Sequence, residues 1–264
     1  MANIGDKKIT HIYQGNNLIL EDNQETKDIK IGDKKIDFVF QGNKVLYPNP
    51  INHNLVVWYD FKGLSDGIFN KDIANDLTNK SNGSLKNFSY SNGSGYSNGL
   101  LFDGIDDYIS TFVNIDGFGA TFSFSIDVES NTGSFYIMSG ESIYVFIRKN
   151  GNNLDISLLN NLGKQELFSL SNFFLNNIGK QSITILIDAT NKKVKFYKNG
   201  GLLKTFEMSS DAKMNIKIDK IGRSSLNSGY FYKGKIYSVK IYDKPLSDEE
   251  ILHNYNLEKE RWNL

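Results

Sequence analysis

From residue 55 onward the sequence is a run of short alternating segments separated by Asn- and Gly-rich turns, which limits the folds open to the chain. The clearest segment is 121–129, in which every second residue is apolar: Phe122, Phe124, Ile126 and Val128. Because successive side chains of a strand point to opposite faces, this alternation predicts a half-buried strand. Many short strands at close spacing favour an antiparallel β-sandwich over a fold that alternates strands with helices.

Residues 234–255 predict a strand that ends in a short helix. Ile236, Val239 and Ile241 supply the apolar strand positions, and the proline at 245 ends the strand because it cannot donate to a ladder. Ser247 is followed three residues later by Glu250, the spacing of a capping box at a helix start. We expect a helix of about one and a half turns that closes the sandwich.

Residues 1–50 contain an internal repeat with an offset of 27 residues. GDKKI at 5–9 recurs at 32–36, and QGN at 14–16 recurs at 41–43. Each copy predicts a β-hairpin, because glycine in a short loop between apolar runs indicates a tight turn. A lone hairpin is marginally stable in water, so the two units either serve attachment and oligomerisation or are a β decoration. The prolines at 48 and 50 predict a linker that separates two domains, 1–50 and 51–264.

Composition excludes several classes of protein. Acidic and basic residues balance at 30 each, which disfavours nucleic acid and anionic membranes as partners. The chain has no cysteine, which excludes disulfides, thiolate metal sites and a cysteine nucleophile. No apolar run reaches the ~20 residues of a membrane span, so membrane insertion is not expected. The polar N-terminal residues lack the apolar stretch of a secretory signal.

Several segments together resemble the laminin-G-like, concanavalin A-like lectin and glucanase family of jelly rolls: LVVWYDF at 55–61, FDGIDDYI at 102–109, FYKNG at 196–200, IGR at 221–223 and residues 234–255. The resemblance implies two antiparallel sheets, a last strand that pairs near the first, and a short helix packed on the outside.

The hairpin repeats, which end in Tyr47 and Pro48, resemble modules of bacteriophage tail and baseplate proteins. That resemblance implies a virion protein that is assembled in the host cytoplasm. It also implies that residues 1–50 bind other tail or baseplate proteins and that the chain forms a homo-oligomer.

The same family includes glycosidases that carry E-x-D-x-E on their active strand, which places three carboxylates on one face. The nearest match here is Ser125, Asp127 and Glu129, in which serine stands where the first glutamate is required. We therefore expect no catalytic residues, and we expect this polar face to lie in solvent.

Two further groups of residues are candidate binding sites. Asp103, Asp106 and Asp107 cluster within five positions, and hard carboxylate oxygens suit calcium, although Asp also caps turns. Tyr96, Phe118 and Tyr230 are aromatic residues in expected loops. Their rings either stack on sugars or anchor the loops.

These patterns favour a non-enzymatic phage virion protein, of a tail, tail fibre or baseplate. Its carbohydrate-binding-type domain would bind the host surface or serve as structural decoration. Two alternatives stay open: a polysaccharide hydrolase of the same superfamily, and a bacterial surface adhesin, which the missing signal disfavours.

Overall fold

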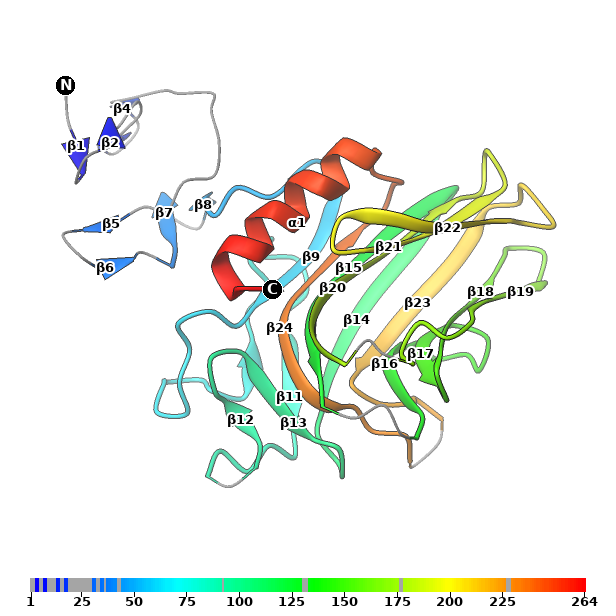
Figure 1. Cartoon of the computed structure of the whole chain (residues 1–264), viewed down its shortest axis with the longest axis horizontal. Coiled ribbons are helices and arrows are strands. Elements are labelled where there is room, and N and C mark those ends of the chain that lie inside the picture. The colour runs from blue at the N-terminus through cyan, green and yellow to red at the C-terminus, as the bar shows by residue number, and fades with distance from the viewer. Residues whose placement is uncertain are drawn as a thin grey trace.

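The structure is a computed structural model that describes all of the chain except residues 1–2, 5–6, 9–12, 15–16, 19–29, 32–33, 36, 42–43, 92, 130–132, 176–177 and 227–228. Two antiparallel sheets form a sandwich (Figure 1). The first, called the β14 sheet, has the order β10 (Ile73–Ala74), β11 (Gly83–Lys86), β14 (Tyr108–Gly117), β23 (Met214–Ile221), β16 (Phe135–Ser139), β17 (Phe146–Asn150), β18 (Asn153–Leu159) and β19 (Gln165–Leu170). The second, called the β24 sheet, has the order β12 (Gly95–Tyr96), β13 (Leu100–Asp103), β24 (Lys233–Tyr242), β15 (Gly119–Val128), β20 (Gly179–Asp188), β21 (Lys193–Lys198) and β22 (Gly201–Glu207), with β9 (Leu55–Asp60) paired to β24.

The alternating segments supply the core between the two sheets. In β15 the apolar positions 122, 124, 126 and 128 are all buried in one large cluster, which confirms the predicted strand. Ile109, Ile218 and Ile156 enter the same cluster from the β14 sheet. The predicted all-β jelly-roll architecture is therefore confirmed.

The strand β24 is the element that joins the parts of its sheet. It pairs with β15 along one side, and with β13 and β9 along the other. Since β9 is the first strand of the sandwich, the last strand pairs with the first, as the family resemblance implies. Ile236, Val239 and Ile241 are all fully buried.

A helix, α1 (Asp248–Trp262), follows β24 and begins with the predicted capping box. The Ser247 backbone N–H donates to Glu250 over 2.8 Å, and the Glu250 backbone N–H donates to the Ser247 hydroxyl over 3.2 Å. The helix is 15 residues long rather than a turn and a half, because Leu257 and Trp262 of its second half are also buried. Among the described residues, no helix is long and apolar enough to span a membrane.

Buried charges fix α1 on the outer face of the β24 sheet, the side away from β14 (Figure 1). Lys240 of β24 pairs with Glu258, and Asp60 of β9 pairs with Arg261. The Ser125 hydroxyl of β15 also donates to Glu258, over 3.0 Å, and Ser125 is buried. The expectation that the face bearing Ser125 lies in solvent is therefore wrong at this residue, because alternation shows only which face a residue shares, not what covers that face.

Residues 1–50 contain four two-stranded pairs among the described residues: β1 (Asn3–Ile4) with β2 (Lys7–Lys8), β3 (Tyr13–Gln14) with β4 (Asn17–Leu18), β5 (Lys30–Ile31) with β6 (Lys34–Lys35), and β7 (Val39–Gln41) with β8 (Lys44–Tyr47). The third and fourth pairs follow the first and second by about the repeat length of the sequence. The domain boundary at residue 50 stays a prediction.

The segment that follows β8 packs against the sandwich. Tyr47, Pro48 and Pro50 are buried, and the Ile51 backbone N–H donates to Asn254 of α1 over 3.0 Å. The Tyr242 hydroxyl donates to the Ile51 carbonyl over 3.0 Å. The prolines at 48 and 50 therefore lie in a segment that packs against the sandwich, and the division into two domains stays a prediction.

Candidate functional site

The two outer faces of the sandwich differ. Helix α1 covers part of the β24 sheet, whereas Phe112 and Leu167 on the β14 sheet are 61% and 54% exposed. Within the described part of the chain, the outer face of the β14 sheet is therefore a sheet surface that no helix covers.

A row of paired side chains crosses this open face over four strands. Tyr136 of β16 lies opposite Arg148 of β17, Arg148 lies opposite Asp155 of β18, and Asp155 lies opposite Ser169 of β19. The Arg148 guanidinium donates to the Tyr136 hydroxyl over 3.3 Å and to the Asp155 carboxylate over 3.2 Å. Ser169 donates to the other Asp155 oxygen over 2.7 Å. These contacts hold the row rigid, and they leave Arg148 stacked 4.5 Å from the ring centre of Phe146.

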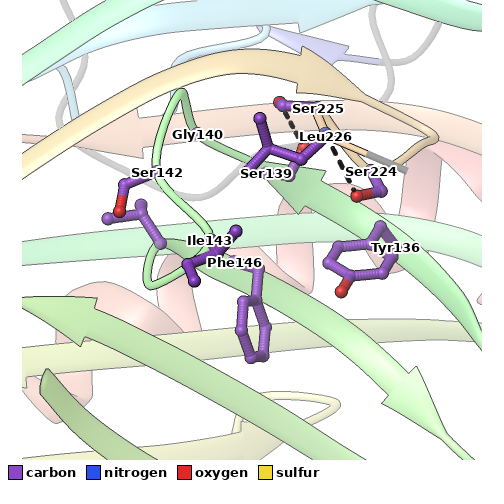
Figure 2. A pocket seen from close by; sticks show the side chains of 10 residues that line it. Tyr136, Ser139, Gly140, Ser142, Ile143, Phe146, Ser224, Ser225 and Leu226 are labelled. Atoms are coloured by element: carbon purple, nitrogen blue, oxygen red, sulfur yellow. Dashed lines mark hydrogen bonds between the residues drawn. The ribbon is translucent and has the colours of Figure 1, made fainter. Parts of the chain in front are cut away.

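A small pocket lies at the Tyr136 end of this row. Residues of β16, the following turn, the start of β17 and the loop 224–226 converge on it in Figure 2. Its volume is about 60 Å³, and we call it the Tyr136 pocket. Its lining is Tyr136, Ser139, Gly140, Ser142, Ile143, Val145, Phe146, Ser224, Ser225 and Leu226.

The pocket is apolar on one side and carries hydroxyls on the other. Ile143 and Leu226 are 58% and 55% exposed at its rim. On the polar side, Ser139 and Ser225 lie 2.7 Å apart, oxygen to oxygen, and Ser225 donates to the Asp219 carboxylate. None of the lining residues is charged in the part of the chain that the structure describes.

The structure places the three predicted aromatic residues in different surroundings. Tyr230 is 53% exposed and its ring centre lies 6.2 Å from that of Tyr136, so it adjoins the Tyr136 pocket. Phe118 is 50% exposed and lies just before the first residue of β15. Tyr230 lies shortly before β24 in sequence, and the start of β24 pairs with the last residues of β15. The two residues are therefore at opposite ends of β15. The two rings are thus separated by about 30 Å of strand. Tyr96 is buried and cannot present its ring to a sugar, because it lies in β12 against Tyr90 and Phe61.

Sequence reasoning missed most of the open-face site. The run of short segments between Asn- and Gly-rich turns from residue 55 onward predicts strands in this region, and Arg148 is among the few arginines of the chain. The strand pattern and the polar arginine together indicate only that Arg148 lies on an outward face of a sheet. The contact of Ser139 with Ser225, 86 positions apart, depends on the pairing of β16 with β23 and has no local signal.

The three aspartates of the loop after β13 do come together. Carboxylate oxygens of Asp103, Asp106 and Asp107 lie within 4.8 Å of one another. Asp103 Oδ1 accepts from the backbone N–H of Ile105 over 2.7 Å, and Asp107 Oδ2 accepts from the backbone N–H of Asp103 over 2.9 Å. The predicted turn capping is therefore present. Asp107 is fully buried, and its Oδ1 has no hydrogen-bond partner among the described residues.

Burial raises the pKa of the Asp107 carboxyl to about 6, and its backbone hydrogen bond from Asp103 offsets this only in part. A cation or a proton at Oδ1 would relieve the cost of this buried charge. Carboxylate oxygens are hard donors, so the three aspartates fit calcium. Water would have to supply most of the remaining ligands of the ion.

The comparisons with known proteins agree with this fold. Residues 103–252 match the model of the Laminin_G_3 family, which is described as the concanavalin A-like lectin/glucanases superfamily. The chain belongs to this superfamily. No curated protein matches the sequence.

Solved structures similar to this superfamily member include the botulinum neurotoxin serotype D binding domain, with a TM-score of 0.59 and 14% identity over 77% of this chain and 50% of that chain. The same toxin's ligand-binding domain in complex with N-acetylneuraminic acid has a TM-score of 0.58 and 13% identity over 77% and 50% of the two chains. A mutant Trypanosoma rangeli sialidase has a TM-score of 0.53 and 11% identity over 79% and 33%. The chain thus spans half or less of these three proteins, and the likeness shows a shared fold.

Proposed function

We propose that this chain is a non-enzymatic, carbohydrate-binding protein of a bacteriophage tail, tail fibre or baseplate that attaches to the host surface. The observation that carries the binding role is the open face of the β14 sheet, where a rigid polar row ends at the Tyr136 pocket. Aromatic faces beside hydrogen-bonding groups suit sugars, whose rings have apolar faces and polar edges. Similarity to toxin and sialidase structures adds support at the level of the fold.

A hydrolytic role has less support. The position that requires the first glutamate of the glycosidase pattern is Ser125, which is buried and donates to Glu258 of α1. The Asp127 carboxylate accepts from the Tyr237 hydroxyl over 3.3 Å, so it too is engaged on the helix-bearing sheet. A substrate would have to displace α1 to reach Ser125.

We assign attachment to other tail proteins, and homo-oligomerisation, to residues 1–50. Phe38, Val45 and Ile51 already pack against the sandwich, whereas the earlier repeat is too short to form a core of its own. Assembly would also strengthen weak sugar binding, because linked sites act at a high effective concentration.

The test compares the full chain with a chain that begins at Asp37, on purified cell walls of the host. We expect the full chain to be oligomeric by light scattering and to be retained on the walls, and neither chain to release reducing sugar. The shorter chain should be monomeric and bind roughly 100-fold more weakly. Release of reducing sugar would establish the hydrolase alternative. If the full chain is not retained on the walls, host-surface binding is rejected and structural decoration is the remaining role.

We also propose that calcium binds at Asp103, Asp106 and Asp107. A site with few protein ligands should have a millimolar dissociation constant, so calcium at ten times that value adds about 1.4 kcal/mol. We expect the melting temperature to rise by roughly 3–6 °C with calcium but not with magnesium. The exposed Asp106 allows the control Asp106→Asn, which should abolish the rise. Equal melting in calcium and in a chelator would contradict the site.

A further inference from the structure

The Tyr136 pocket has the size of a sugar substituent and not of a sugar ring. A bound water needs about 10–15 Å³ of such space, so about 60 Å³ holds roughly four or five non-hydrogen atoms. A pyranose ring with its hydroxyls has about twelve non-hydrogen atoms and exceeds this about two- to threefold. A ring would therefore lie outside, over the exposed Tyr230 and Leu226, while one of its substituents enters.

Two of the pocket's hydroxyls, those of Ser139 and Ser142, offer one acceptor and one donor. Ser225 donates to the Asp219 carboxylate, and Ser139 has a single hydrogen, which goes to Ser225 or to the Arg223 carbonyl at 2.8 Å. In either arrangement that hydrogen points into the protein and a lone pair of Ser139 stays open, so Ser139 acts as an acceptor. Ser142 accepts from the Tyr144 backbone N–H over 3.2 Å, and its own hydrogen has no acceptor among the described residues. Ser142 is therefore the donor.

The pocket also lacks a charge to meet an ionic group. Of the charges close to the pocket, Arg148 is paired with Asp155 at 3.2 Å and Asp219 with Lys220 at 3.1 Å, and the Arg223 guanidinium donates to the Ser224 carbonyl over 2.8 Å. A carboxylate, sulfate or phosphate entering the pocket would lose its hydration without a counter-charge. The ligand group is thus neutral, carries one donor and one acceptor, and ends in an apolar atom that can contact Ile143 or Leu226.

We propose that the Tyr136 pocket binds the acetamido group of an N-acetylated amino sugar. This group has about four non-hydrogen atoms, which matches the space. Its N–H meets Ser139, its carbonyl oxygen meets Ser142, and its methyl group meets the apolar rim. The proposal rests on the carbohydrate-binding role above and names the class of sugar for that site.

The test is saturation-transfer NMR on the full chain with N-acetylglucosamine, N-acetylgalactosamine and glucose as probes. We expect both acetylated sugars to bind at millimolar concentration, with the strongest transfer to the acetyl methyl protons, and glucose to bind at least about fivefold more weakly. The variant Ser142→Ala should lose about fivefold in affinity for the acetylated sugars and little for glucose. Ser171→Ala, at an exposed serine in the turn after β19, is the matched control and should change neither.

The outcomes separate this proposal from the proposed function. Equal binding of glucose and the acetylated sugars, or equal effects of the two serine variants, overturns the acetamido assignment while carbohydrate binding stands. The acetamido assignment is also overturned, and carbohydrate binding stands, if the chain is retained on cell walls but shows no saturation transfer to the acetylated sugars. Absence of binding both to the walls and to every sugar overturns the proposed function itself.

Discussion

A chain that lacks residues 235–264 should fail to fold its sandwich. The deletion removes nearly all of β24, which lies between β15 on one side and β13 and β9 on the other, and it also removes α1. The remaining β15 would present an unpaired edge, and the core would lose Ile236, Val239 and Ile241. Exposed edges of this kind pair with other chains and aggregate.

The measurement is thermal unfolding by circular dichroism together with light scattering. We expect no cooperative transition and large aggregates for the truncated chain. A chain that lacks only residues 263–264 is the control, because Asn263 is exposed beyond the end of α1, and it should melt like the full chain. A truncated chain that stays monomeric and melts cooperatively would contradict the central place of β24.

How far the sequence predicted this molecule depends on the distance over which each signal acts. The alternation at 121–129 and the Ser247–Glu250 capping box are local patterns, and the structure confirms both. The full length of α1 was missed because its second half is held by partners far away in sequence, such as Asp60 for Arg261.

The candidate sites show the same limit. Asp103, Asp106 and Asp107 are close in sequence, and the structure brings them together. Tyr96 was expected in a loop, but the packing of Tyr90 against it buries its ring, and no short pattern signals that contact. The Tyr136 pocket joins residues more than 80 positions apart, so only the strand order reveals it.

Replacing Glu258 with glutamine should be among the most destabilising single changes in the sandwich. Glu258 and Lys240 are an ion pair with side chains only 2% exposed. Besides Glu258, Lys240 has only neutral neighbours among its described contacts, namely the Ser238 hydroxyl at 3.1 Å and the Trp58 ring at 5.5 Å. Glu258→Gln therefore leaves a buried ammonium without a counter-charge, at a cost of about 3–5 kcal/mol. The melting temperature should fall by roughly 6–20 °C.

The reverse change should cost less. In Lys240→Met the Glu258 carboxylate keeps the nearby charge of Arg261 and the hydrogen bond from Ser125. Replacing both partners, in Lys240→Met with Glu258→Leu, removes both buried charges and should restore most of the stability. Urea unfolding of the parent chain, Glu258→Gln, Lys240→Met and the double variant compares the four free energies of unfolding and shows how strongly the two positions are coupled.

The pair also sets the response to acid. Burial alone would raise the pKa of Glu258, but the charges of Lys240 and Arg261 lower it below its ordinary value of 4.5. A carboxylate with a lowered folded-state pKa stabilises above its unfolded pKa, and this stability is lost as the pH falls through the folded value. The free energy of unfolding of the parent chain should thus decline below about pH 4.5, and the double variant should lack this part of the decline.

A surface pair provides the matched control. Lys193 and Glu207 lie 3.2 Å apart on β21 and β22, with side chains 43% and 73% exposed. Because water screens this pair, Glu207→Gln should cost less than about 1 kcal/mol. If Glu258→Gln costs no more than Glu207→Gln, then water reaches Lys240. In that case apolar contacts such as those of Ile251 and Leu257, and not the buried charges, hold α1 on the sheet.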